Sequence, residues 1–68
     1  GDTAQIEFGV LASPEWVDVF GELWTPTSDA IDRVPESGEA MATLTADNEL
    51  VVELANGEMA EFGLVQCG

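Results

Sequence analysis

One cysteine and no histidine occur in a chain of only 68 residues, and this shortage most constrains what the chain can fold into. A domain of this length buries a small core and commonly needs disulfides, a metal or a partner subunit to be stable. Cys67 alone makes no internal disulfide, and one thiol without histidine makes no structural zinc site. The fold must therefore depend on apolar packing or on contacts with a neighbouring chain.

Two interpretations of Cys67 stay open. It is either a small apolar residue near the end of a strand or one half of an intermolecular disulfide. The second interpretation requires an oxidising compartment. The opening residues, Gly1-Asp2-Thr3, contain no basic segment followed by an apolar run, so no signal peptide is expected. The location of the protein stays open, with a virus particle or a saline environment as the settings considered.

The charge of the chain excludes several classes of partner. Fourteen Asp and Glu residues against a single basic residue, Arg33, give a formal net charge of −13. Nucleic-acid backbones and anionic membrane surfaces are bound through basic side chains, so neither is an expected partner. The acidity has four candidate explanations: a solvated surface suited to high salt, docking onto a basic protein, mimicry of DNA, and calcium binding. The calcium hypothesis depends on Asp47, Asn48 and Glu49, which lack the glycine and spaced glutamate of an EF-hand loop.

The pattern of apolar residues predicts strands at both ends of the chain. Residues 4 to 11 alternate, which is typical of a strand with one buried face, and Ala4, Ile6, Phe8 and Val10 form its apolar side. Near the C-terminus three apolar-rich segments are separated by Asp47-Asn48 and Asn56-Gly57. Asn-Gly predicts a tight hairpin turn in which both residues have positive φ. The residues expected on the inner face are Ala42, Leu44, Leu50, Val52, Leu54, Ala60, Phe62 and Leu64.

The middle of the chain is harder to assign. Residues 13 to 24 begin with Ser13-Pro14, as a helix does, and their apolar residues also recur at helical spacing. Gly21 and two valines favour the alternative, a strand or a hairpin turning at Phe20-Gly21, which we prefer. Residues 25 to 38 are rich in proline, glycine and hydroxyl side chains and predict a connection, with one helical turn from 28 to 33.

These segments predict one all-β domain over residues 1–68. The expected architecture is a small five-stranded antiparallel barrel or sheet with a three-strand meander at the C-terminus. The class becomes α+β if residues 14–24 are helical. No apolar run reaches the roughly 18 residues of a membrane-spanning helix.

No residue pattern in the chain indicates catalysis. There is no histidine to act as a base and no lysine to form a Schiff base, and no hydroxyl lies in a nucleophile motif. Glycines form neither a dinucleotide-binding nor a phosphate-binding motif, so no cofactor and no small-molecule substrate are expected. With no metal ligands beyond scattered carboxylates, we expect a protein that is not an enzyme.

Three of the five aromatic residues, Trp16, Phe20 and Trp24, lie within nine positions. One interpretation is that they fill the core. The other is that they are partly exposed and bind a protein partner, either a second copy or another member of an assembly, with the surrounding acids as a polar rim. A strand apolar on both faces, as 16–24 would be, needs cover on both sides.

The segment VDVFGELW, residues 17–24, together with Ser28-Asp29, residues 35–38 and ELVVE, residues 49–53, resembles the soluble C-terminal domain of the NfeD family. The resemblance extends from Pro14 to Glu53. It implies a five-stranded OB-type barrel in a membrane-associated protein that binds partners such as flotillin-like proteins. Two departures are Glu15-Trp16, where a glycine is usual, and the further strand at 58–66.

The functional prediction is a non-enzymatic structural or interaction module that acts through protein contacts. Its sharpest form is a small accessory component of a larger assembly, such as a virion decoration or minor capsid protein. An NfeD-like accessory domain and an acidic DNA mimic are the alternatives.

Overall fold

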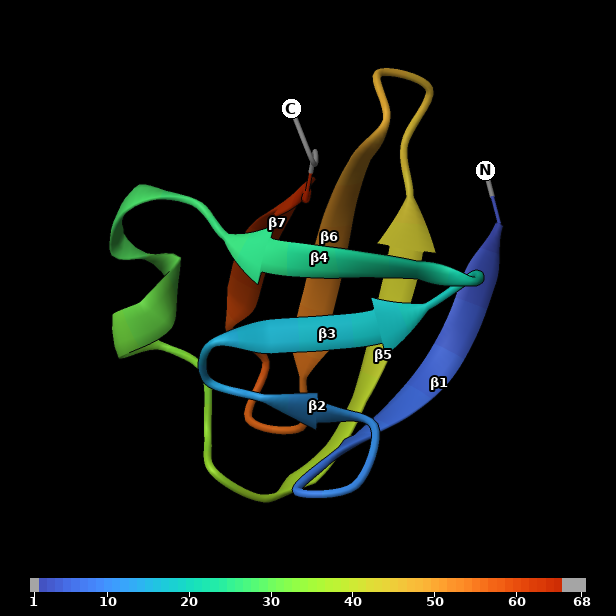
Figure 1. The fold of residues 1–68 in the computed structure, drawn as a ribbon. Coiled ribbons are helices and arrows are strands. Elements are labelled where there is room, and N and C mark those ends of the chain that lie inside the picture. The colour runs from blue at the N-terminus through green and yellow to red at the C-terminus, as the bar shows by residue number, and fades with distance from the viewer. Residues whose placement is uncertain (1, 66–68) are drawn as a thin grey trace.

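Seven strands and one short 3₁₀ helix make up the computed structural model, which describes residues 2–65 (Figure 1). The prediction for Cys67 lies outside the described residues. In chain order the elements are β1 (Thr3–Phe8), β2 (Ala12–Ser13), β3 (Trp16–Val19), β4 (Glu22–Pro26), η1 (Ser28–Asp32), β5 (Gly38–Leu44), β6 (Glu49–Leu54) and β7 (Met59–Leu64).

The strands close into a barrel in the order β1-β2-β3-β4-β7-β6-β5. Neighbouring strands are antiparallel except β1 and β2, which share a single parallel bridge between Phe8 and Ala12. The all-β class is therefore confirmed, as is the C-terminal meander of β5, β6 and β7. The predicted count of five strands is wrong, because residues 16–26 form two strands and the two-residue β2 adds another.

Residues 14–24 adopt the hairpin rather than the helix. Val19 and Glu22 face each other across a two-residue turn formed by Phe20 and Gly21. Both turn residues have positive φ, 58° for Phe20 and 73° for Gly21, as a type I′ hairpin turn requires. A glycine at the second position removes the steric cost of this geometry there, which explains the glycine at position 21.

The Asn-Gly turn differs in detail from the prediction. The hairpin between β6 and β7 exists, but its loop has three residues, 55 to 57, closed by a 2.7 Å hydrogen bond from the Leu54 N–H to the Glu58 oxygen. Gly57 has a positive φ of 93°, whereas Asn56 does not. The loop therefore follows the three-residue pattern in which only the last position is left-handed.

The core lies inside the barrel and is apolar throughout the described residues. Of the eight residues predicted on the inner face of the meander, six are buried, Leu44 is half-buried and Leu64 is 37% exposed. Val10, also predicted to face inward, is 66% exposed, because β1 ends at Phe8 and the chain turns there. The largest fully buried side chains are Ile6, Phe8, Val17, Leu50, Val52 and Phe62.

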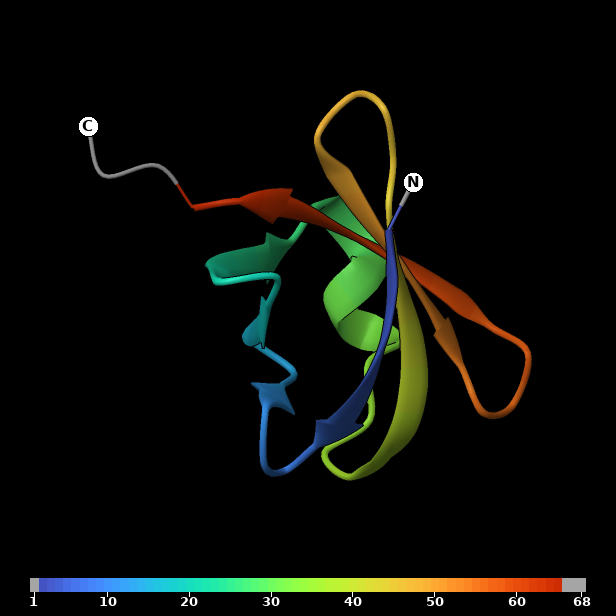
Figure 2. The same ribbon diagram turned by 90° about the vertical axis from the view of Figure 1, so that its right-hand side faces the viewer.

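The connection from β4 to β5 covers one side of the barrel. Its helical turn, predicted for 28–33, is η1, which contacts β4 and β7 (Figures 1 and 2). Ala30 and Val34 of this segment are buried and extend the core. The connection therefore covers this side of the barrel with apolar side chains and leaves its acidic residues in solvent.

Candidate protein-interaction site

The pairing of β3 with β4 decides which aromatic residues reach the surface. Val17 lies opposite Trp24, and both are almost fully buried, at 0% and 3% exposure. Successive strand residues point to opposite faces, so the outward positions are Trp16 and the next pair, Asp18 opposite Leu23. The two tryptophans consequently lie on opposite faces of the same hairpin.

Trp24 is a core residue. Its indole Nε1 donates a 3.1 Å hydrogen bond to the main-chain oxygen of Val19, which satisfies the one polar atom of the side chain. The structure thus places Trp24 inside the barrel, in agreement with the interpretation that it fills the core, and leaves only 3% of it exposed. Phe20 is half-buried in the turn and packs against the core, so part of its side chain remains accessible.

Trp16 is half-buried on the outer face, where it has exposed apolar neighbours that the sequence analysis did not identify. Leu23 on β4 is 45% exposed. Leu11 is 48% exposed, and its main-chain oxygen accepts a 3.0 Å hydrogen bond from the Asp18 N–H, which places it beside β3. Val65 follows β7 and donates its N–H to the Leu23 oxygen at 3.0 Å, so the apolar surface continues across β4.

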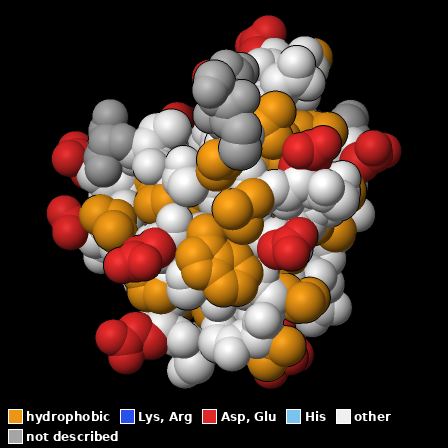
Figure 3. Space-filling model, in the orientation of Figure 1, with side chains coloured by type: hydrophobic (Ala, Val, Ile, Leu, Met, Phe, Trp, Pro, Cys, Tyr) orange, Lys and Arg blue, Asp and Glu red, His pale blue; other side chains and the backbone are white. Residues whose placement is uncertain are grey.

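We call Leu11, Trp16, Leu23 and Val65 the hairpin face. Figure 3 shows hydrophobic side chains gathered on this side of the molecule, over β3 and β4, with Asp and Glu side chains around them. The carboxylates of the hairpin are Glu15, Asp18 and Glu22, all exposed. Asp18 lies directly opposite Leu23, so one carboxylate stands within the apolar surface itself.

The opposite side of the barrel has two exposed methionines. Met41, Glu53 and Met59 face outward in one row across β5, β6 and β7, and the glutamate separates the two methionines. Met41 and Met59 are 41% and 54% exposed. The row has the same arrangement as Leu11, Asp18 and Leu23, in which a carboxylate also lies between two apolar residues. It therefore provides a comparison surface of similar exposure without a tryptophan.

The carboxylates are distributed around the whole barrel. All fourteen belong to the described residues and all are exposed. They lie on β1, β5, β6 and β7, on the hairpin, on η1 and in the loops. Among the described residues no three potential metal ligands gather at one point, and the Asp47, Asn48 and Glu49 turn is no exception.

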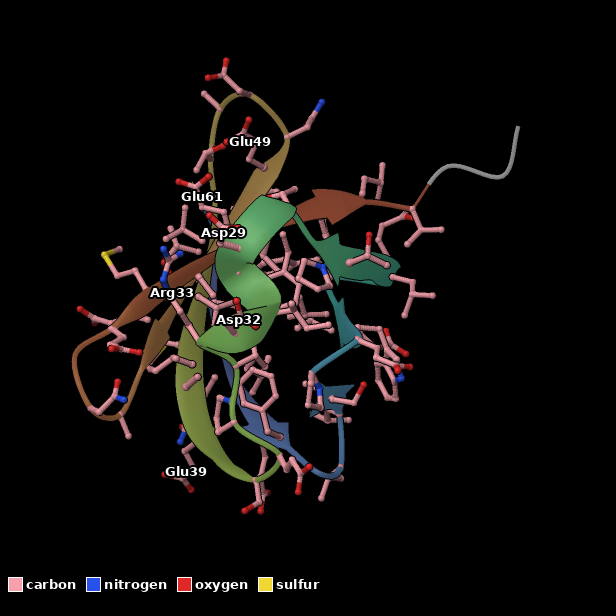
Figure 4. The ribbon with its side chains drawn as sticks, turned by 90° about the vertical axis from the view of Figure 1, so that its left-hand side faces the viewer. Asp29, Asp32, Arg33, Glu39, Glu49 and Glu61 are labelled. Atoms are coloured by element: carbon pink, nitrogen blue, oxygen red, sulfur yellow. The ribbon has the colours of Figure 1, made fainter. Side chains whose placement is uncertain are left out.

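A shallow groove runs between η1 and the β6–β7 pair and has a volume of about 360 Å³. Arg33 and Asp29 line it from the connection, and Glu61 and Met59 line it from β7 (Figure 4). The groove offers one guanidinium between carboxylates and no nucleophile with an adjacent base.

In comparisons with known proteins, no family model, no curated protein and no solved structure matches the chain. The resemblance to the NfeD domain therefore stays a prediction. Within residues 2–65, no helix has the length and apolar character needed to cross a membrane.

Proposed function

We propose that the chain is a non-enzymatic interaction module whose hairpin face binds a protein with an apolar patch and a basic rim. The observation that carries the proposal is the set of apolar side chains on β3, on β4 and in the turn before β2, namely Trp16, Leu23 and Leu11, with carboxylates around them (Figure 3). Tryptophan is enriched among the residues that dominate binding energies, and polar groups typically surround such anchors.

Charge favours a different protein over a second copy as the partner. Association through the hairpin face of two identical chains would bring Asp18, Glu15 and Glu22 of each close to those of the other. A net charge of −13 on each chain adds long-range repulsion. Lys and Arg side chains around the binding patch of another protein would complement these carboxylates and speed association.

A small accessory subunit of a larger assembly, such as a virion decoration or minor capsid protein, is the form of this function that we favour. An NfeD-like accessory domain is the alternative. The genomic neighbourhood separates the two, since capsid genes favour the first and genes for a membrane protease and a flotillin favour the second.

The experiment compares three immobilised proteins in an extract of the cells that produce the chain: the wild type, Leu11→Ser with Leu23→Ser, and the control Met41→Ser with Met59→Ser. We expect one basic protein to be retained by the wild type and the methionine control and lost by the leucine variant. Equal retention by all three proteins would contradict the proposal, because the two variants remove comparable exposed apolar area from opposite sides of the barrel.

A further inference from the structure

The pairing of β1 is unequal on its two sides. Along one side all six residues, Thr3 to Phe8, pair with β5. Along the other side only the bridge from Phe8 to Ala12 connects β1 with β2. Figures 1 and 2 together place the β3–β4 hairpin apart from the first half of β1. On its β2 side, β1 is therefore paired only at its C-terminal end, and the rest of that side has no neighbouring strand.

The hydrogen-bond register shows which groups the unpaired side carries. The Leu44 N–H donates to the Asp2 oxygen at 2.7 Å, which makes this residue pair a hydrogen-bonded one. Hydrogen-bonded and non-hydrogen-bonded pairs alternate along an antiparallel ladder. Ala4 and Ile6 therefore bond to β5, while Thr3, Gln5 and Glu7 direct their N–H and C=O groups away from it.

Most of these outward groups have no partner within residues 2–65. The Glu7 oxygen accepts from Val10 at 3.2 Å and from Leu11 at 2.9 Å, as the chain turns after β1. The N–H groups of Thr3, Gln5 and Glu7 and the oxygens of Thr3 and Gln5 make no other hydrogen bond in that range. All three residues are exposed. They form an open strand edge of the kind that pairs with another extended chain.

We infer that this edge of β1 binds an extended basic segment of a partner protein as an added strand. The outward side chains of such a strand would lie beside those of Thr3, Gln5 and Glu7. Glu7 faces Glu39 across the β1–β5 pair, and both line a depression with Gln5 and Leu11. Lys or Arg at alternate positions of the added strand would meet these carboxylates.

A second copy of the chain is a poorer occupant of the edge. An antiparallel pair of two copies that used Thr3, Gln5 and Glu7 of both chains would place Glu7 opposite Thr3, and it would bring together two chains that each have a net charge of −13. Two chains of the same high net charge repel each other over long range, which disfavours this pair. The same acids thus discourage self-pairing of an edge that lacks the usual protection by lysine, proline or a bulge.

The inference goes beyond the proposed function, because the hairpin face and the β1 edge use different chemistry and share only Leu11, which belongs to the hairpin face and also lines the depression beside Glu7. The hairpin face contributes apolar side chains, whereas the edge contributes main-chain groups. Trp16→Ala is therefore expected to weaken contacts through the hairpin face while leaving strand addition unchanged. This variant separates a failure of one proposal from a failure of the other.

The first test is amide hydrogen exchange of the free protein, followed by nuclear magnetic resonance. We expect Thr3, Gln5 and Glu7 to exchange at nearly the rate of an open chain, while Ala4 and Ile6 exchange slowly. A blocked peptide that alternates Lys and Val is then added at about 0.15 M salt. We expect exchange at Thr3, Gln5 and Glu7 to slow by about tenfold, with the same peptide carrying Glu for Lys as the negative control.

The second test removes one main-chain donor from the edge. Gln5→Pro deletes an N–H that points away from β5, a position where strands tolerate proline, and Gln5→Ala is the matched control. We expect Gln5→Pro to weaken binding of the Lys-Val peptide by about tenfold and Gln5→Ala to change it less than about twofold. Slow exchange at Ala4 and Ile6 verifies that the variant is folded, and Thr3→Pro replaces it if it is not.

Three results would overturn the inference. The first is protection of Thr3, Gln5 and Glu7 in the free monomer. The second is equal peptide binding by the wild type and the proline variant. The third is protection that appears when the protein alone is concentrated, since the occupant would then be a second copy.

Discussion

The indole Nε1 of Trp24 donates a 3.1 Å hydrogen bond to the main-chain oxygen of Val19, so one side chain joins β4 to the end of β3 from inside the barrel. Trp24 also packs opposite Val17, and both are buried. Trp16, by contrast, is half-buried on the outer face. The two tryptophans are therefore expected to respond differently to substitution.

Trp24→Phe is expected to lower the free energy of unfolding by about 1–3 kcal/mol, because it deletes a hydrogen bond and leaves a cavity in the core. Trp16→Phe is expected to cost less than about 1 kcal/mol, since the outer position keeps an aromatic ring and buries less area. Urea unfolding of both variants measures the difference. Fluorescence quenching gives a second measurement, in which the indole of Trp24 stays shielded and that of Trp16 is accessible. Equal destabilisation by the two substitutions would contradict the assignment of the faces.

The sequence predicted the secondary-structure elements better than it predicted which side chains of each strand point into the core. In a single strand running from 16 to 24, the even-numbered residues Trp16, Phe20 and Trp24 would share a face. The two-residue turn pairs Val17 with Trp24 and Asp18 with Leu23, so even-numbered residues of β4 share a face with odd-numbered residues of β3. The sequence predicts a turn at Phe20-Gly21, but which side chains face the core depends on the turn having two residues, and this length follows from the register.

Other parts of the candidate site had only weak signals in the sequence. Leu11 was assigned to the end of a strand, whereas the chain turns at Gly9, whose φ of 96° favours glycine. β2 contains two residues, too few for an alternating pattern to predict it. The open edge of β1 depends on which distant strands become its neighbours, and that is a property of the fold rather than of a local segment.

Salt is expected to stabilise the protein. The fourteen exposed carboxylates repel each other, and only one basic residue offsets them. The screening length is about 30 Å at 0.01 M salt and falls to about 3 Å at 1 M. The melting temperature should rise by about 5 °C or more between these conditions. Sodium chloride serves as the test salt, because sulfate also strengthens apolar burial. A melting temperature independent of sodium chloride would contradict an acidic surface suited to high salt.

DNA mimicry is expected to fail in a competition experiment. A mimic needs carboxylates spaced like the phosphates of a duplex, whereas the fourteen acids here are spread over strands, loops and η1 on several sides of the barrel. The chain should therefore not displace a labelled duplex from a basic DNA-binding protein at about 0.15 M salt, measured by fluorescence anisotropy. Heparin provides the positive control for displacement. Clear displacement by the chain would revive the mimic hypothesis.

Glu7 and Glu39 are the carboxylate pair whose repulsion the fold makes most specific. They lie directly opposite each other on β1 and β5. The register makes this a non-hydrogen-bonded pair, in which opposed side chains lie closest together. Glu7→Lys should therefore stabilise the protein by about 0.2–1 kcal/mol, because it replaces a repulsive cross-strand pair with an attractive one.

The control for this prediction is Glu58→Lys, which changes the net charge by the same amount at an exposed residue beside the β6–β7 turn. Both variants reduce the long-range repulsion of the chain, so both should gain some stability at low salt. The gain from the cross-strand pair itself should persist at about 0.5 M salt, where long-range terms are screened and close pairs are screened less. Urea unfolding of the wild type and both variants at low and high salt separates the two contributions. Equal gains from Glu7→Lys and Glu58→Lys at both salt concentrations would show that only the net charge matters and that the Glu7–Glu39 pair has no energetic role of its own.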